Sequence, residues 1–306
     1  AVYRALIEEK EKRRVRSAFQ QYLNPEVIRR LLVNPDLVKP RKTEITVMFS
    51  DVRGFTTISE KLDAQELAAL LNEYLTGMTQ IVFQHNGTLD KYIGDAVMAF
   101  WGAPIESRGH STEGCHAALQ MIARLKEMQI KWKSEGKPVM DIGIGLATGV
   151  ASVGEMGSAL HKGYTALGDT VNLSSRIEGL NKEYGTHILM SDATYAAVED
   201  PFLIFREIDL IRVKGKLKPV TLYELVAARG TPEGDAPDIE LRLDLFAQGR
   251  ACYRERRWQD AQIIFERLLE RWPDDGPAHM YLSRCKEYLL SGPEENWDGV
   301  YVMTHK

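Results

Sequence analysis

The stretch MFSDVRGFT at residues 48–56 decides the fold, because it is typical of a buried strand that turns directly into a helix. The β-branched and aromatic run from Ile45 to Phe49 predicts a strand with little polar surface, and that strand is expected to stop at Asp51. Gly54 allows the backbone to turn closely into the next helix. Asp51 is therefore expected at the carboxyl end of a strand, beside a helix N-terminus.

A second acidic turn, DKYIGD at residues 90–95, is expected to end one strand and begin another. Either acidic motif alone is ambiguous, since an Asp after a strand often caps a helix and a Gly-Asp pair often marks a hairpin. Together they predict a phosphate site with two metal ions. Hard Mg²⁺ or Mn²⁺ prefers a few carboxylates together with phosphate oxygens and water, and a helix N-terminus suits a triphosphate.

Composition limits the class of protein. The chain has 306 residues, 44% hydrophobic and 27% charged, which predicts a soluble protein with one large core and a smaller unit. The net charge of −4 gives no reason to expect nucleic acid as a partner. The three scattered cysteines predict buried thiols in a reducing compartment. No run reaches the length of a spanning helix and no signal peptide opens the chain, while Ala1 in place of Met suggests a fragment.

The order of predicted elements favours an α/β (α+β) fold with a ferredoxin-like βαββαβ core. The core is expected from a strand at 44–50, helices at about 54–84, strands at 87–92 and 95–101, a helix at about 111–135 and a strand at 139–149. A strand near Tyr164, a helix at about 168–184 and strands around 202–213 and 219–226 extend it. No dinucleotide fingerprint and no GxxxxGK[ST] loop occurs, which argues against Rossmann and P-loop kinase folds.

Three motifs in this order resemble the class III nucleotidyl cyclase domain: FSDVRGFT at 49–56, DKYIGD at 90–95 and GDTVNLSSR at 168–176. The resemblance covers about 43–229 and implies an adenylate cyclase that converts ATP to 3′,5′-cyclic AMP and pyrophosphate. It implies two Mg²⁺ or Mn²⁺ ions per active site, held by Asp51, Val52 and Asp95. It also places Gly54, Phe55 and Thr56 among the substrate-binding residues.

The resemblance assigns purine selection to Lys91 and Thr165. A lysine can donate to N1 of adenine and a threonine oxygen can accept from the 6-amino group, whereas guanylate-forming relatives typically carry Glu and Cys. Many adenylate cyclases have Asp in place of Thr165, so this chain resembles a lysine-threonine subgroup. The alternative interpretation of Thr165 is an ordinary edge-strand threonine.

The same resemblance implies catalytic roles for Asn172 and Arg176, which lie four apart and so share a helix face. One would orient the ribose, and the other would stabilise charge as the 3′-hydroxyl attacks the α-phosphorus in line. The alternative interpretation is that the two residues form an ordinary solvated helix face. Lys214 would bind the terminal phosphates; the alternative is a turn lysine. No general base is expected, because none of the histidines His85, His110, His116 and His161 falls inside a matched motif.

In this family the metal carboxylates and the base-selecting residues that act on one nucleotide come from different protomers. The resemblance therefore implies a homodimer with two equivalent shared sites and an almost inactive monomer.

The flanking segments predict two further units. Residues 1–42 hold eleven Lys and Arg against five Asp and Glu, which is typical either of a solvated helix or of a transducing segment just cytoplasmic of a membrane span. The second interpretation implies an upstream membrane sensor and a location at the cytoplasmic face of the inner or plasma membrane. Residues 230–306 begin with a linker at 230–237 and continue with a tetratricopeptide-like spacing of Gly249, Ala261, Phe265 and Pro273.

This repeat-like unit is too short to stand alone, so it is expected to pack on the cyclase domain or on its dimer mate, with the tail at 297–303 docking as a strand or as an anchor. Two readings compete with an active adenylate cyclase. One is a catalytically silent, ATP-binding cyclase-like switch, which the intact motif residues disfavour; the other is a guanylate cyclase, which Lys91 and Thr165 disfavour. Diguanylate cyclases are excluded because their Gly-Gly-Asp-Glu-Phe turn is absent.

Overall fold

The computed structural model describes residues 28–29, 32–158, 162–212, 219–293 and 297–302 of the chain. Most of the basic N-terminal segment, His161 and Lys214 lie outside these ranges. The elements in chain order are η1 Pro35–Val38, β1 Arg41–Val52, α3 Phe55–Ser59, α4 Ala64–Gln84, β2 Thr88–Ile93, β3 Ala96–Trp101, α5 His110–Ser134, β4 Ile142–Gly157, β5 Lys162–Leu167, α6 Asp169–Tyr184, β6 Ile188–Ser191, α7 Asp192–Ala196, β7 Leu203–Arg212, β8 Val220–Ala228, α8 Ile239–Arg254, α9 Trp258–Arg271, α10 Gly276–Ser291 and β9 Tyr301–Val302.

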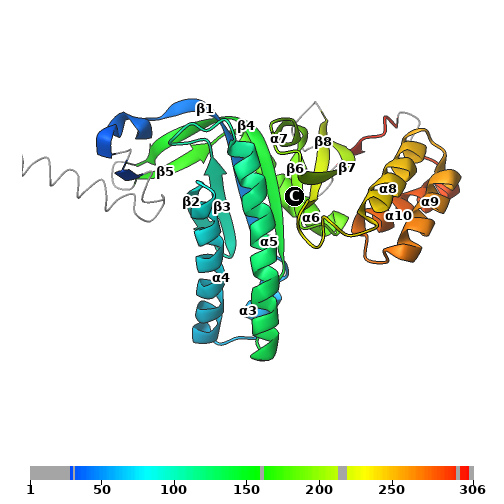
Figure 1. The fold of residues 1–306 in the computed structure, drawn as a ribbon, viewed down its shortest axis with the longest axis horizontal. Coiled ribbons are helices and arrows are strands. Elements are labelled where there is room, and N and C mark those ends of the chain that lie inside the picture. The colour runs from blue at the N-terminus through cyan, green and yellow to red at the C-terminus, as the bar shows by residue number, and fades with distance from the viewer. Residues whose placement is uncertain (1–27, 30–31, 159–161, 213–218, 294–296, 303–306) are drawn as a thin grey trace, which may run out of the picture.

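The described strands form one sheet in the order β2-β3-β1-β4-β6-β8-β7-β9, with β5 paired to β4. The first four strands, β1 to β4, are joined by antiparallel pairs and alternate with helices as β-α-β-β-α-β. This arrangement confirms the predicted ferredoxin-like core. The same sheet continues through β6, β8 and β7, so the later strands extend the core as expected (Figure 1).

Side-chain alternation along β4 explains why helices cover both faces of the sheet. Ile142, Ile144 and Leu146 point into the core beneath α4 and α5, which run side by side in Figure 1. The intervening Gly143 and Gly145 point toward α6, where a Cβ on Gly145 would lie 2.3 Å from the Glu178 nitrogen. These glycines, which form no nucleotide fingerprint, let α6 lie directly on the strand.

Two elements of the catalytic domain at 43–229 were not predicted. The four-residue strand β6 and the five-residue helix α7 lie between α6 and β7, and β6 pairs in parallel with β4 and antiparallel with β8. A four-residue apolar run is too short to show a period, so only its pairing identifies it. Strand β4 also extends beyond the predicted end at 149, because its second half pairs with both β1 and β5.

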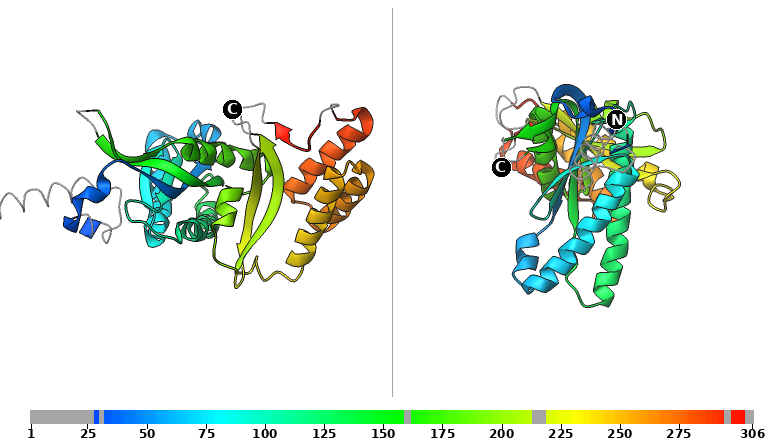
Figure 2. Two further views of the ribbon diagram at one scale, coloured as in Figure 1. Left: turned by 90° about the horizontal axis from the view of Figure 1, so that it is seen from above. Right: turned by 90° about the vertical axis from the view of Figure 1, so that its left-hand side faces the viewer.

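Helices α8, α9 and α10 pack on the end of the sheet that carries β7, which confirms that the C-terminal unit packs on the catalytic domain (Figure 2). Their apolar side chains share one cluster with residues of α6 and β7, among them Ile177 and Ile208. Gly249 and Phe265 meet inside the unit, since a Cβ on the glycine would lie 2.8 Å from the ring. After them β9 adds to β7 in parallel, as expected of a docking tail.

The three cysteines Cys115, Cys252 and Cys285 are buried and unpaired with one another, as predicted. Within the part of the chain that the structure describes, no helix combines the length and the apolar character required to cross a membrane.

Candidate active site

The two predicted metal carboxylates converge on a single backbone amide. Asp51 lies near the end of β1, and Asp95 lies in the tight turn between β2 and β3. The Val52 N–H donates to Asp51 Oδ1 at 3.1 Å and to Asp95 Oδ2 at 3.2 Å. Antiparallel pairing of β1 with β3 places these acids together, because it sets Ser50 opposite Val97.

The electrostatics of this pair suit a hard divalent cation. Burial, a side-chain hydrogen bond with Asp95 and the charge of Asp95 raise the pKa of Asp51 to about 6. A cation between the carboxylates would relieve their repulsion, and the carbonyl is the only oxygen that the buried Val52 can offer. No described group of three or more His, Cys, Asp or Glu side chains forms a full metal site. Mg²⁺ also takes phosphate oxygens and water as ligands, which a nucleotide at this pair would supply.

The loop after Asp51 is held by Arg53, for which no role was predicted. Gly54 adopts the left-handed conformation, with φ of 65°, and caps α3. The Arg53 N–H donates to the Asp141 carbonyl at 2.8 Å, and its guanidinium pairs with the Asp141 carboxylate at 3.1 Å. Arg53 also donates to the Thr186 carbonyl. The loop is thus tied to the start of β4 and to the end of α6.

The three predicted substrate residues at this loop differ in exposure. Gly54 and Thr56 are exposed, whereas the Phe55 side chain packs against the core beneath α4 and α5. Any contact of Phe55 with a phosphate must therefore come from its backbone.

A third carboxyl group, Glu178 on α6, lies over Gly143, which pairs with Asp51 across β1 and β4, and no role was predicted for it. Burial and then the charge of Asp51 raise the pKa of Glu178 to about 7, with a smaller contribution from Asp95. Its only sequence signal is its place two residues after Arg176, just beyond the matched motif.

Asn172 and Arg176 are exposed on α6, on a different side of the helix from Glu178. Residues two apart on a helix are separated by about 200° around its axis, so Arg176 and Glu178 point in nearly opposite directions. The buried face is fixed by Ser174, whose hydroxyl lies 2.9 Å from both the Val47 and the Gly145 carbonyl oxygens. The predicted catalytic face of α6 therefore points away from the carboxylate pair of its own chain.

The structure brings the predicted purine-selecting residues together. Lys91 Nζ lies 3.2 Å from Thr165 Oγ1, although the two residues come from β2 and β5. Both also bind Asp90: its carboxylate accepts from the Thr165 hydroxyl at 2.8 Å and pairs with Lys91 at 3.0 Å. Asp90 lies inside the quoted motif, but no role was predicted for it.

Three of the histidines considered as bases are bonded elsewhere. His85 bonds to Gln120, His110 to Thr46 and His116 to Asp200, and none of these partners was predicted as a site residue.

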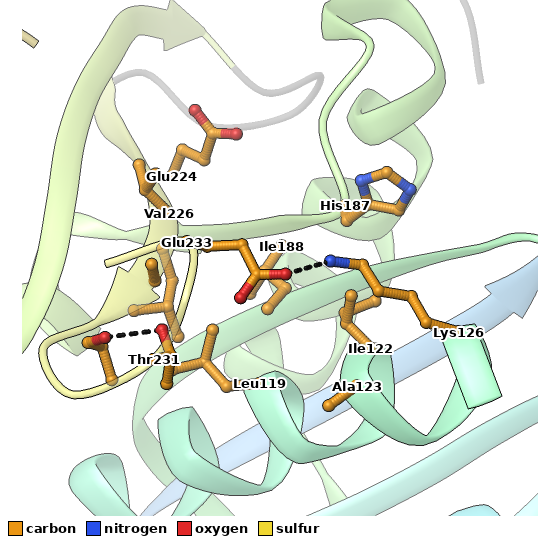
Figure 3. Close-up of a pocket in the computed structure, with 13 residues that line it drawn as sticks. Leu119, Ile122, Ala123, Lys126, His187, Ile188, Glu224, Val226, Thr231 and Glu233 are labelled. Carbon is orange, nitrogen blue, oxygen red and sulfur yellow. Dashed lines mark hydrogen bonds and ion pairs between the residues drawn. The ribbon is translucent and has the colours of Figure 1, made fainter. Parts of the chain in front are cut away.

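A separate cavity of about 340 Å³ lies between α5, β8 and the segment after it (Figure 3). Its apolar wall includes Leu119 and Ile122, and an exposed ion pair joins Lys126 to Glu233 at 2.6 Å. None of the predicted site residues lines it, so it is distinct from the carboxylate site.

Comparison with known proteins identifies the family. Residues 37–227 match the family described as the Adenylate and Guanylate cyclase catalytic domain. "Adenylate cyclase 1" of Rhizobium meliloti is 38% identical over 185 residues, which are 60% of this chain and 28% of that protein. "Adenylate cyclase, terminal-differentiation specific" of Dictyostelium discoideum is 31% identical over 274 residues, which are 87% of this chain and 12% of that protein. The chain thus spans under a third of either relative.

Two solved cyclase structures are similar to this chain in sequence and fold. The adenylyl cyclase CyaB from P. aeruginosa is 35% identical with a TM-score of 0.57, covering 62% of this chain and 97% of that one. The guanylyl cyclase Cya2 is 30% identical with a TM-score of 0.58, covering 62% of this chain and 94% of that one. The chain therefore belongs to the adenylate and guanylate cyclase catalytic domain family, which confirms the class III nucleotidyl cyclase domain predicted from its three motifs.

Proposed function

We propose that this chain is an adenylate cyclase that converts ATP to 3′,5′-cyclic AMP and pyrophosphate. The observation that carries the proposal is the contact of Lys91 with Thr165 in a fold that also joins Asp51 to Asp95. The first pair presents a donor and an acceptor that match the N1 and 6-amino groups of adenine. A guanylate cyclase is the second candidate, because Cya2 shares the fold at a similar TM-score.

In the proposed reaction the ribose 3′-oxygen forms a bond to the α-phosphorus. The bond between the α-phosphorus and the oxygen that bridges the α- and β-phosphates breaks. Pyrophosphate leaves, and the 3′-hydroxyl proton passes to solvent. Asn172 orients the ribose, and Arg176 stabilises charge on the transferred phosphoryl group. Gly54, Phe55 and Thr56 bind phosphate oxygens next to Asp51, and Lys214 binds the terminal phosphates.

Asp51, Asp95 and the Val52 carbonyl are proposed to hold two Mg²⁺ or Mn²⁺ ions per site. Bound divalent ions supply charge neutralisation at the phosphates and acidify a coordinated hydroxyl.

We propose further that the active form is a homodimer with two shared sites. The orientation of α6 supports this assembly, because Arg176 and Asn172 point away from the Asp51 and Asp95 of their own chain. Large apolar side chains are also exposed near the purine pair, on β2, β4 and β5: Tyr92, Ile93, Val150 and Leu167. A second copy would cover them and supply the missing half of each site.

The flanking segments are assigned by composition. We propose that residues 1–42 transmit a signal from an upstream membrane sensor at the cytoplasmic face of the membrane. Residues 43–229 form the catalytic domain, and residues 230–306 form a linker with a tetratricopeptide-like unit. The basic excess of residues 1–42 supports the first assignment. Binding of the whole chain to anionic vesicles, compared with a chain that begins at residue 37, tests it.

The proposed activity is tested by product analysis with ATP and with GTP, each with Mn²⁺ and with Mg²⁺. Cyclic AMP as the main product is expected. Cyclic GMP as the main product would favour the guanylate alternative, and nucleotide binding without turnover under every condition would contradict both.

Shared sites are tested by complementation. Asp51→Ala and Asn172→Ala chains should each be almost inactive, because each lacks one half of both sites. Co-expressed, they should form heterodimers that regain one intact site, so that activity recovers to about a quarter of wild type if chains pair at random. Absence of recovery in heterodimers shown by two affinity tags to exist would contradict the shared site.

A further inference from the structure

Asp90 is buried, with 3% of its surface exposed, at the centre of the purine-selecting cluster. The β2–β3 register shifts between Leu89 and Lys91, so Asp90 is the extra residue of a β-bulge. In a regular strand Leu89 and Lys91 would face the same side. The bulge instead leaves Leu89 and Asp90 buried and Lys91 exposed, which turns the lysine toward the ligand side.

The Asp90 carboxylate crosses from β2 to β5 and is satisfied by three donors. The Thr165 hydroxyl contacts its two oxygens at 3.0 and 2.8 Å. The Ala166 N–H donates to Oδ2 at 3.0 Å, and Lys91 Nζ pairs with Oδ1 at 3.0 Å. Among the strands that the structure describes, β5 pairs only with β4, so these contacts join β2 and β5 without a backbone ladder between them.

These contacts determine which hydrogen-bonding groups remain for a ligand. A carboxylate only accepts, so the single hydroxyl proton of Thr165 must point inward to Asp90. The hydroxyl oxygen has two lone pairs, and one already accepts from Lys91 at 3.2 Å. The Lys91 ammonium has three protons, of which Asp90 and Thr165 take two. One donor on Lys91 and one acceptor on Thr165 are left.

We propose that Asp90 is a specificity-determining positioning residue, which fixes the Lys91–Thr165 pair as donor and acceptor and thereby selects a 6-aminopurine over a 6-oxopurine. The inference rests on the proposed adenylate cyclase function. Adenine presents a 6-amino donor where guanine presents a 6-oxo acceptor, so a hydroxyl whose proton is held inward cannot pair with guanine. Without Asp90 the Thr165 hydroxyl can rotate and donate outward, and Lys91 loses the anion that holds it.

The test is the isosteric Asp90→Asn chain. Its carboxamide oxygen, in the place of Oδ2, keeps the acceptor for the buried Ala166 N–H and for the Thr165 hydroxyl. Its NH₂ group, in the place of Oδ1, removes the anion from Lys91 and donates to the Thr165 oxygen, and so competes for the lone pair that is left for adenine. The ratio of kcat/KM for ATP to that for GTP should fall about tenfold or more, because the Thr165 acceptor for the 6-amino group is then occupied and Lys91 has lost the carboxylate that holds it. The same fall should appear in the ratio of dissociation constants of 3′-deoxy-ATP and 3′-deoxy-GTP, which bind but lack the attacking hydroxyl.

Asp275→Asn is the matched control, because Asp275 is also a buried, cation-paired aspartate but lies in the C-terminal unit. It should lower the melting temperature and leave the ATP:GTP ratio unchanged. If Asp90→Asn does not fold, Asp90→Ser, a smaller side chain that also removes the anion, carries the same expectation.

Three outcomes decide between the two proposals. The role of Asp90 is supported if Asp90→Asn lowers the ATP:GTP ratio of kcat/KM and lowers the melting temperature no more than Asp275→Asn does. A ratio within twofold of wild type, in a chain whose wild type makes cyclic AMP, overturns this inference alone. A wild type that converts no ATP overturns the proposed function, and the 3′-deoxy binding ratios then decide whether Asp90 selects the purine.

Discussion

Thr46 shows how one buried polar residue is satisfied by partners from several elements. Its hydroxyl lies 2.8 Å from His110 Nδ1, 2.9 Å from Ser111 Oγ and 2.8 Å from Thr148 Oγ1. Thr148 continues the network to Thr194 at 3.1 Å. β1, α5, β4 and α7 are thus joined by hydroxyls inside the core, where each lost partner would leave a buried group unsatisfied.

His110 makes this network sensitive to acid. Burial lowers the pKa of His110, although the charges of Glu44 and Glu113 oppose the shift. The unfolded chain, with a histidine pKa of about 6.5, therefore takes up the proton first. The stability that uncharged His110 contributes is fully present above about pH 6.5. As the pH falls from there to the folded-state pKa, the free energy of unfolding should decrease by at most about 1.4 kcal/mol per pH unit.

Urea unfolding between pH 8 and pH 5 measures this slope. His110→Asn, which cannot titrate, should show a shallower loss than wild type, and His279→Asn at an exposed histidine serves as the reference. Equal slopes for wild type and His110→Asn would contradict the assignment.

Helix α6 is the element on which the catalytic and the structural residues meet. It lies so close to β4 that a Cβ on Gly145 would be 2.4 Å from the Ser174 carbonyl oxygen. Asn172 and Arg176 leave the helix on its exposed side, so the depth at which α6 sits determines where they point.

Gly145→Ala should therefore lift α6 from the sheet and cost about 1–3 kcal/mol in the free energy of unfolding, because the core has no space for the methyl group. Cyclase activity should fall further than stability alone explains. Gly179→Ala, on the same helix with nothing within 4 Å of the new Cβ, should stabilise the chain by about 0.5–1 kcal/mol. Thermal melting and turnover of both variants measure these effects, and a Gly145→Ala chain with unchanged melting would refute the close packing.

Across the whole molecule, buried charges join the C-terminal unit to the sheet. Arg206 of β7 contacts Glu224 at 2.6 Å and Asp275 at 2.7 Å, and Arg242 of α8 adds a contact to Asp275 at 2.8 Å. Burial alone would raise the pKa of Asp275, but Arg206 and Arg242 outweigh it and hold that pKa below its usual value. Nearby, Asp209 of β7 pairs with Arg284 of α10 at 2.7 Å.

Removing the Asp275 carboxylate should weaken the contact between the C-terminal unit and the sheet. Asp275→Ala is expected to cost about 3–5 kcal/mol, because it leaves the buried Arg206 without one of its two anions. Asp260→Ala breaks an exposed pair with Arg257 and should cost less than about 1 kcal/mol. Chemical denaturation compares the two; similar losses would contradict a tightly joined C-terminal unit.

The sequence by itself determined the order of the core elements, since strand and helix periodicity is encoded in neighbouring residues. The Asp51–Asp95 and Lys91–Thr165 pairs were implied by the resemblance of three motifs to a known family, and the structure brings both pairs together. The functional roles of these residues stay predictions. The tertiary structure alone decided the direction of the catalytic face of α6, the position of Glu178 and the place on the sheet, beside β7, where α8 to α10 pack. It also decided the bulge that buries Asp90. Each of these depends on contacts between segments far apart in the chain, which no local pattern of residues encodes.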